Sequence, residues 1–558
     1  MPVRRARAAE VHALPVVDAL SLSRPPNLPS RIRDALGFIS GGVGSVLDDQ
    51  RGVGLCAIMS RGALIFSPAV QPNPKHFASS RPVARINFFI SHSWSAGRLD
   101  KYAGLLYRFN LVPALVAMHV AALAAAFGFA AGVLPPMATI ASTDLPGVRL
   151  PMGAYCQIAG TWAFVLVLMG WGRALALLET MGLIARTDCF LDKMCIDQHD
   201  NDSKARGIDQ IGRFLRNSDE LLILWSPDYF MRLWCCFEVA VYLHFLQLGD
   251  NEPGALQKAS PVQVASEQRK LEIVPLPLTK FGFFLASIYT IGALSFRVMM
   301  LAYDVEVYGF WYTTIHSGFV FLCAVPISLF FREFTAQRRE LDRQLQSFTF
   351  SETRSYSEED RAMLREIISQ TYRSGKAGDD GIARFEGQLR SHMPAVVAEL
   401  MGRPSVLPTK LLALIGSTLW LFCLDGLAAH ALLPYSTFDG ARGHAVHLVA
   451  YAASQLAFSF GVVPLMGTTS ISLAVRLQRV PCGGELGVYA LLILLPAAVF
   501  ISGDSLCQFL WLQLPIALSI PANLLVLGVA LALNTIRRSP CRRLGADRKA
   551  PVAVLLLH

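Results

Sequence analysis

Side chains of the types that carry out chemistry gather in three places along this sequence. The first is a polar run that directly follows an apolar segment: Ser91, His92, Ser93 and Trp94. The second is a set of cysteines with one histidine, the residue types that bind zinc. The third is a pair of charges, Arg297 and Asp425, inside long apolar stretches. Each set predicts a different chemistry and depends on the elements that position it.

The cysteine and histidine set is not spaced like a metal site. Cys195 and His199 form a Cys-x3-His unit, which is not the spacing of paired thiolate ligands. Cys189 and Cys235 fall where the interior of a sheet is expected, and Cys236 is adjacent. We therefore expect buried free cysteines and no metal. The eleven cysteines are spread along the chain, several in apolar stretches, so a secreted disulfide framework is not expected.

The composition predicts an integral membrane protein. Of the 558 residues, 53% are hydrophobic and 16% are charged, whereas a soluble domain usually carries about 25% charged residues. A membrane-spanning helix needs about 20 mainly apolar residues. The seventh of the stretches below is short, and Pro515 and Pro521 interrupt the eighth. The expected bundle of about eight transmembrane helices comprises residues 111–134, 152–178, 281–303, 308–331, 411–433, 445–465, 486–501 and 506–533.

The placement of lysine and arginine orients these spans. With the N-terminus inside, the outer loops hold only Arg149 and Arg442, while the inner segments hold many basic residues. Cytosolic loops carry such an excess, so both termini are expected in the cytosol of a multi-pass protein. The formal charge of +9 does not indicate nucleic-acid binding, because the basic residues are not gathered on one predicted element. The expected partner is the lipid bilayer.

Arg297 and Asp425 lie deep inside the third and the fifth expected span. Counted from Lys280 and Lys410, each is roughly 22 to 25 Å from the inner membrane face at 1.5 Å per residue. Charges at such a depth usually pair with one another or mark a pathway. We therefore expect a salt bridge between Arg297 and Asp425.

Strand and helix patterns alternate on either side of the first two spans. Helices with one apolar face are expected at 99–109, 207–215 and 233–245, and residues 193–206 are expected to form a polar loop. This alternation is typical of an α/β domain with a flavodoxin-like, doubly wound parallel sheet, whose binding sites lie at the carboxyl ends of the strands. The expected strands are 85–94, which runs into the polar loop at Ser91, and 189–192, 220–226 and 272–276.

Five blocks in this order resemble the Toll/interleukin receptor (TIR) domain family. In chain order, the five blocks are similar to the family's first strand and loop, its second strand, the helix behind its BB loop, its serine–tyrosine–tryptophan–cysteine–glutamate block and its fourth strand. The resemblance covers 85–110 and 179–280. The blocks are 88–93, 190–192, 207–218, 225–239 (in two pieces) and 273–276.

The resemblance implies a function for this domain. Some TIR domains hydrolyse NAD with a glutamate in the helix after the tryptophan–cysteine step, and others only assemble complexes. The resemblance places this glutamate at Glu238 of the present chain. Its carboxylate would stabilise positive charge on the ribose as nicotinamide leaves. Ser91, His92, Ser93 and Trp94 would contact ribose and phosphate, and Trp94 or Trp234 would stack on a ring. The plainer alternatives are that Glu238 pairs within its helix and that Trp234 packs in the core.

The chain departs from the family in three respects. A membrane hairpin interrupts the domain after its first helix, the loop equivalent to the BB loop is long and acidic, and the third span leaves no room for a fifth strand.

Further expectations are a short strand at 63–66 and a cytosolic helical hairpin in 332–410. The expected order is 1–84 (N-terminal, partly disordered), 85–110 with 179–280 (TIR-like), 111–178 and 281–331 (membrane hairpins), 332–410, 411–533 (later spans) and 534–558 (cytosolic tail).

Two classes of function remain open. The first is a membrane signalling protein whose TIR-like domain is an assembly scaffold, through self-association or other TIR domains, or an NAD hydrolase with no cofactor besides its substrate. The second is a transporter or channel regulated by a cytosolic domain. Few polar groups lie deep in the spans and no internal repeat is visible, which favours the first class.

Overall fold

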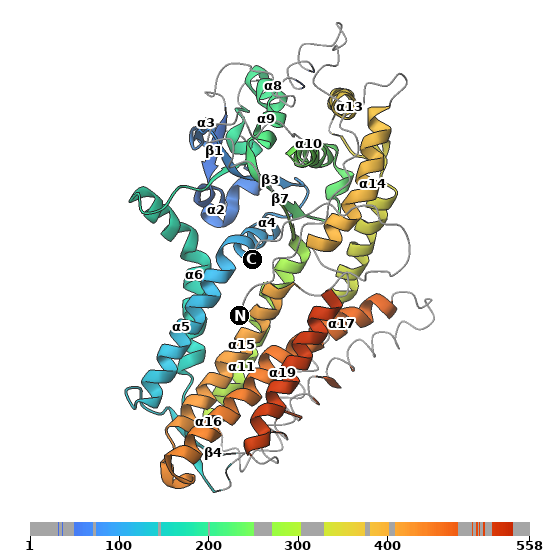
Figure 1. Ribbon diagram of the computed structural model, residues 1–558. Helices are drawn as coiled ribbons and strands as arrows, with labels where there is room; N and C mark the ends of the chain where they lie inside the picture. The colour runs from blue at the N-terminus through green and yellow to red at the C-terminus, as the bar shows by residue number, and fades with distance from the viewer. Residues whose placement is uncertain are drawn as a thin grey trace, which may run out of the picture.

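The computed structural model describes residues 50–70, 74–142, 147–198, 201–249, 270–302, 329–355, 357–373, 380–400, 408–477 and 516–538, with single residues between some of these ranges. A sheet and its covering helices form one end of the molecule, and long helices form the other (Figure 1). The architecture is therefore a mixed α/β domain joined to a helical bundle.

The sheet has six strands in the order β2-β1-β6-β3-β7-β8. Its four parallel strands confirm the expected ones, and the third of them is a run in which Leu221 to Trp225 have no exposed surface. Such continuous apolar runs arise because parallel strands are covered on both faces. Their bounds are β3 (Ile86–His92), β6 (Asp188–Phe190), β7 (Ser218–Trp225) and β8 (Lys270–Pro275).

The N-terminal segment adds two antiparallel strands that the sequence did not predict. They are β1 (Arg51–Gly54), which pairs with β6, and β2 (Arg81–Pro82). The short strand expected at 63–66 is wrong: Leu64–Phe66 is a 3-10 turn after α2 (Leu55–Ala63). Arg61, Gly62 and Ala63 have positive φ angles there, so the backbone turns sharply instead of extending.

Helices cover both faces of the sheet. On one face, α4 (Arg98–Leu105) packs so closely that a Cβ on Gly104 would meet Leu276, Val274 and Leu224. On the other face lie α9 (Ile211–Arg216) and α10 (Leu233–Gly249). Residues 201–206, expected in a polar loop, instead begin α8 (Asn201–Asp209).

Five helical stretches are long and apolar enough to cross a membrane. They overlap the expected spans one, two, three, five and six, so the described residues do not show all of the about eight expected spans. The fourth (308–331) and the seventh (486–501) lie almost entirely outside the described residues. The eighth overlaps α19 (Ile516–Arg538), whose apolar part is shorter. The five stretches are Arg98–Ala130, Tyr155–Thr180, Leu276–Ala302, Thr409–Ala431 and Gly440–Val475.

The helices on the α4 face of the sheet continue into the bundle. A π-helical turn (Leu106–Asn110) joins α4 to α5 (Leu111–Ala130) without a loop. Likewise, α11 (Leu276–Ala302) begins directly after β8. Lys280 on α11 forms an ion pair with Asp100 on α4, with 2.9 Å between Nζ and Oδ1. Both long helices therefore connect the sheet to the bundle as continuous rods (Figure 1).

Among the described residues, α6, α15 and α16 pack in the bundle beside α5 and α11, and a small hairpin caps its far end. α6 (Tyr155–Thr180) returns the chain towards the sheet, and α15 (Thr409–Ala431) packs against α5 and α11. α16 (Gly440–Leu456) follows. The two-stranded hairpin of β4 (Ala138–Ala141) and β5 (Arg149–Met152) joins α5 to α6.

The helical hairpin expected in 332–410 is present. Ser357 caps α13 (Glu358–Tyr372) by accepting a hydrogen bond from the backbone of Asp360, and α14 (Gly381–Leu400) packs beside α13. The Tyr372 hydroxyl donates to the carbonyl of Ala240 on α10 at 2.8 Å. The apolar face of this hairpin is thus used within the chain.

Candidate functional site

Polar side chains converge at the carboxyl ends of β3, β6 and β7. Ser91 and His92 end β3, and Asp192 follows β6. Asp228 follows β7 in the turn that leads into α10. Since parallel strands end at the same edge, residues far apart in the chain meet here.

Glu238 lies on α10 and is held by the Ser91 hydroxyl of this edge. The Ser91 hydroxyl donates a hydrogen bond to the Glu238 carboxylate, and the Tyr229 hydroxyl is hydrogen-bonded to Ser91. Ser91 and Tyr229 are buried, at 1% and 0% exposure, whereas Glu238 is only partly buried. The carboxylate is therefore fixed by a hydrogen-bonded chain that runs from Tyr229 through Ser91.

Burial raises the pKa of Glu238 to about 8, although the hydrogen bond from Ser91 lowers it and the charge of Asp192 raises it further. At neutral pH the group is therefore mainly protonated when the site is empty. A cation placed beside it would favour the ionised form. The arrangement suits a ligand that brings positive charge to the end of the sheet.

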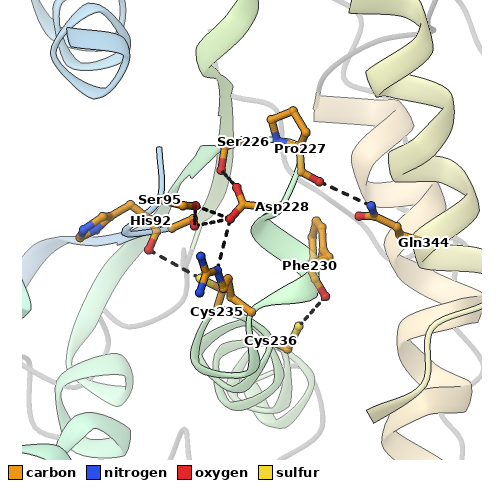
Figure 2. A network of polar contacts seen from close by, with 11 residues as sticks. His92, Ser95, Ser226, Pro227, Asp228, Phe230, Cys235, Cys236 and Gln344 are labelled. Carbon is orange, nitrogen blue, oxygen red and sulfur yellow. Dashed lines mark hydrogen bonds and ion pairs between the residues drawn. The ribbon is translucent and has the colours of Figure 1, made fainter. Parts of the chain in front are cut away.

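Asp228 ties the loops after β3 and β7 together, as Figure 2 shows. It accepts hydrogen bonds from Ser93 at 2.8 Å, from Ser226 at 2.8 Å and from Ser95, and Arg232 pairs with it at 3.2 Å. Burial raises its pKa, but these hydrogen bonds outweigh burial and lower the pKa to about 2. Asp228 is thus a permanent negative charge that fixes the mouth of the site.

His92 lies on the opposite face of β3 from Ser91, because successive side chains of a strand alternate between faces, and Trp94 in the following turn packs against His92. The ring of His92 packs edge-on against Phe66 at 5.0 Å and against Trp94 at 4.6 Å. The indole N–H of Trp94 donates to Asp192 at 3.0 Å. Burial raises the pKa of Asp192 to about 6, partly offset by its hydrogen bonds from Lys193 and Trp94.

Trp234 is separated from this edge of the sheet. Its indole N–H donates to Asp360 on α13 at 3.4 Å, and its ring packs edge-on against Phe237. It is partly buried, so it is neither a free platform nor a fully buried core residue. Of the expected substrate-binding residues, the structure thus brings Ser91 to Glu238 and Ser93 to Asp228.

The cysteines near the site are buried thiols. Cys189, Cys195, Cys235 and Cys236 are all free and buried. The Cys235 thiol contacts the carbonyl of His92, and the Cys236 thiol contacts that of Phe230 (Figure 2). In the described part of the chain, no three His, Cys, Asp or Glu side chains are arranged to hold a metal ion. His199 lies outside the described residues.

Within the described ranges, the salt bridge expected between Arg297 and Asp425 is not formed. Asp425 instead accepts hydrogen bonds from the backbone N–H groups of Cys156 at 2.8 Å and Gln157 at 3.2 Å, at the start of α6. Arg297 donates to the carbonyl of Phe422 at 2.6 Å. The first N–H groups of a helix have no partner within it, and inside a bundle they need an acceptor. Asp425 meets this need, and Arg297 lies one turn of α15 away.

A small cavity of about 70 Å³ lies beside these contacts, between α6, α11 and α15. Gln157, Thr161, Thr290 and Thr418 give it polar groups, and the rest of its lining is apolar. This volume holds about two water molecules.

Several residues of the site were not assigned roles from the sequence. Asp228 and Tyr229 were part of the matched block, and Asp192 ended the second strand, so their position at strand ends was the available signal. Lys101 carried no signal, because it is an ordinary lysine on a predicted amphipathic helix. It is fully buried beside Trp94.

Comparisons with models of known protein families, with curated protein sequences and with solved structures found no match.

Proposed function

We propose that this chain is a multi-pass membrane signalling protein whose cytosolic TIR-like domain hydrolyses NAD at Glu238. One observation carries the proposal: Glu238 on α10 receives a hydrogen bond from Ser91 at the carboxyl edge of the sheet. The two residues belong to separate blocks of the resemblance, and their contact is what a shared site requires.

The strand order supports the finer fold assignment. Taken in chain order, the four parallel strands lie in the sheet as second, first, third and fourth. Flavodoxin-like doubly wound sheets begin with this order and bind ligands at the carboxyl ends beside the first strand. Ser91 ends the first parallel strand, and Glu238 lies on the helix after the third.

The chemistry matches the state of Glu238. The nicotinamide of NAD is a cationic ring, and its charge would favour the ionised form of a carboxyl whose pKa is about 8. The bond between ribose C1′ and the ring nitrogen breaks, and its electron pair leaves with nicotinamide. The carboxylate stabilises positive charge on the ribose. Water then adds to C1′ and releases a proton, which gives ADP-ribose.

The membrane part would anchor the domain and transmit changes to it. Two of the five candidate spans are continuous with the α/β domain: α5 with α4, which covers the sheet, and α11 with β8. A shift of either helix would therefore move the edge that holds the site.

The alternative of a regulated transporter has less support. The cavity near Gln157 favours it, but that cavity is small. Asp425 is engaged as a helix cap and Arg297 by a backbone carbonyl, so both deep charges already have structural roles.

The test is the release of nicotinamide by the purified full chain in lipid nanodiscs, with folding checked by gel filtration and circular dichroism. Glu238→Gln keeps the size of the side chain and is expected to reduce the rate by about 100-fold or more. Glu359→Gln, an exposed glutamate on α13, is the matched control and should keep the rate. If the protein is folded and clustered but does not consume NAD, the function that remains is that of an assembly scaffold.

A further inference from the structure

A short segment before α13 pairs with the turn that leads from β7 into α10. Arg354 forms a parallel β-bridge with Arg232 in that turn. The Arg354 N–H donates to the carbonyl of Met231 at 2.6 Å, and the Arg354 carbonyl accepts from the N–H of Leu233 at 3.0 Å. Residues 348–354, which we call the strap, thus hold the turn through backbone hydrogen bonds.

The strap caps the helix that carries Glu238. Leu233 is the first residue of α10, and the first N–H groups of a helix have no acceptor within it. Leu233 has no exposed surface, so its N–H needs an acceptor from the protein. The carbonyl of Arg354 supplies that acceptor. The start of α10 therefore depends on a residue of another part of the chain.

The same turn carries polar side chains of the candidate site. Arg232 pairs with Asp228 at 3.2 Å. Tyr229 is hydrogen-bonded to Ser91, which donates to Glu238. A displaced turn would move Asp228 and Tyr229 together and loosen the hydrogen-bonded chain to Glu238. The site can therefore be adjusted through this turn without any contact to a substrate.

The strap is anchored on the side away from the turn. Phe348 and Phe350 are buried, and the N–H of Phe350 donates to Glu386 on α14 at 2.7 Å. The carbonyl of Phe348 accepts from Arg390, also on α14, at 3.1 Å. The strap is therefore a packed element and not a free loop.

The helix that precedes the strap reaches the bundle. Residues 329–346 form this helix, whose first residues coincide with the end of the expected fourth span. Its Arg339 donates to the carbonyl of Val475 on α17 (Val463–Leu477). Val475 ends one of the stretches that are long and apolar enough to cross a membrane. The helix at 329–346 thus links a candidate span to the strap.

The other end of this helix touches the turn itself. Gln344 donates to the carbonyl of Pro227 at 3.5 Å, as Figure 2 shows. We propose that Arg354 is a positioning residue, and that the strap transmits movements of the helix at 329–346 to the turn and thereby to Glu238. An engaged strap keeps the site in its hydrogen-bonded arrangement, and a released strap lowers its activity. The effect on NAD rests on the proposed function, whereas the link between helix and turn does not.

The test is hydrogen–deuterium exchange of the full chain in lipid nanodiscs, measured in the peptide 226–234. Arg354→Pro removes the N–H that donates to Met231, and the backbone of Thr353 (φ −69°, ψ 146°) suits a residue before proline. Exchange in the peptide should become about tenfold faster, because one backbone hydrogen bond is lost. Arg354→Ala removes the same exposed side chain, keeps both backbone hydrogen bonds and should exchange as wild type does.

A distant variant tests the transmission. Arg339→Met loses the hydrogen bond to Val475 and should speed exchange at 226–234 by about threefold or more, although it lies outside the strap. Arg343→Met removes an exposed arginine that pairs with Glu340 on the same helix, and should leave this exchange unchanged. Exchange in β3 should stay at the wild-type rate in every variant, which excludes a general loosening of the domain. Arg339→Met decides alone if Arg354→Pro does not fold.

Nicotinamide release gives the second readout. Arg354→Pro should lower kcat/KM by about tenfold or more and move its pH midpoint up, because the hydrogen bond from Ser91 to Glu238 weakens. Arg354→Ala should do neither. If folded Arg354→Pro or Arg339→Met exchanges at 226–234 as wild type does, the coupling is refuted and the strap only packs. If exchange responds but not even wild type releases nicotinamide, NAD hydrolysis is refuted and the coupling stands.

Discussion

The Ser91 hydroxyl donates a hydrogen bond to the carboxylate of Glu238, a residue 147 positions later in the chain. The hairpin of α5 and α6, two helices long and apolar enough to cross a membrane, lies between them in the sequence. The contact therefore forms only when both halves of the α/β domain assemble around that hairpin. This makes the hydrogen bond a direct marker of the split domain and of the proposed site.

Trp234 is expected to matter for packing and not for catalysis. Trp234→Phe keeps an aromatic ring but loses the hydrogen bond to Asp360, which should cost about 0.5–1.5 kcal/mol of stability. The rate of nicotinamide release should stay within about threefold of wild type, a change of under 1 kcal/mol in barrier. Steady-state kinetics and thermal unfolding of the variant check both. A tenfold loss of rate in a folded variant would instead place Trp234 against the substrate.

Asp425 should act as a cap for α6 rather than as an ion-pair partner. Asp425→Ala removes the acceptor for two backbone N–H groups and is expected to lower the free energy of unfolding by about 1–2 kcal/mol. Asn is also a good cap, so Asp425→Asn should retain most of the stability. Unfolding temperatures of the two variants in detergent give the comparison. Equal losses in both would show that the charge itself, next to Arg297, is what stabilises the bundle.

Arg108 links the π-helical turn to the sheet through Glu220 and Glu272. Burial raises the pKa of Glu220 to about 7, although the charge of Arg108 lowers it. Arg108→Met should therefore lower the free energy of unfolding by about 1–3 kcal/mol at pH 8, where Glu220 is ionised and loses its ion-pair partner. The cost should be smaller at pH 5, where Glu220 is protonated in the folded protein.

The matched control for Arg108 is Arg85→Met. Arg85 pairs with Asp219 at the surface, where an ion pair contributes under about 1 kcal/mol. Thermal unfolding at both pH values compares the two variants. A cost for Arg108→Met that is equal at pH 5 and pH 8 would mean that lost packing, and not the carboxylates, explains it.

The parallel strands could be predicted because burial on both faces leaves a long apolar run. β7 shows this from Leu221 to Trp225. β1 and β2 were missed because they are four and two residues long and carry no such run. Their pairing is a tertiary effect, set by the exposed edge of β6.

The site was foreseen only in part, for physical reasons. Ser91 and Glu238 lie where a doubly wound sheet places ligands, so topology alone brings them near each other. Lys101 could not be found, because its burial depends on the positive φ angles of Arg61, Gly62 and Ala63. That turn leads into Leu64–Phe66, which sets the Phe66 ring against Lys101. No local pattern around Lys101 predicts this.

The pH dependence of nicotinamide release tests the role of Glu238 most directly. The pKa of Glu238 is raised to about 8, so kcat/KM should rise with pH as the carboxyl loses its proton, with a midpoint near that value. Ser91→Ala removes a hydrogen bond that lowers this pKa, and should move the midpoint up by about 1 pH unit. Ser347→Ala, at an exposed turn, should leave it in place. A midpoint near the usual glutamate value, or one that Ser91→Ala does not move, would contradict the account.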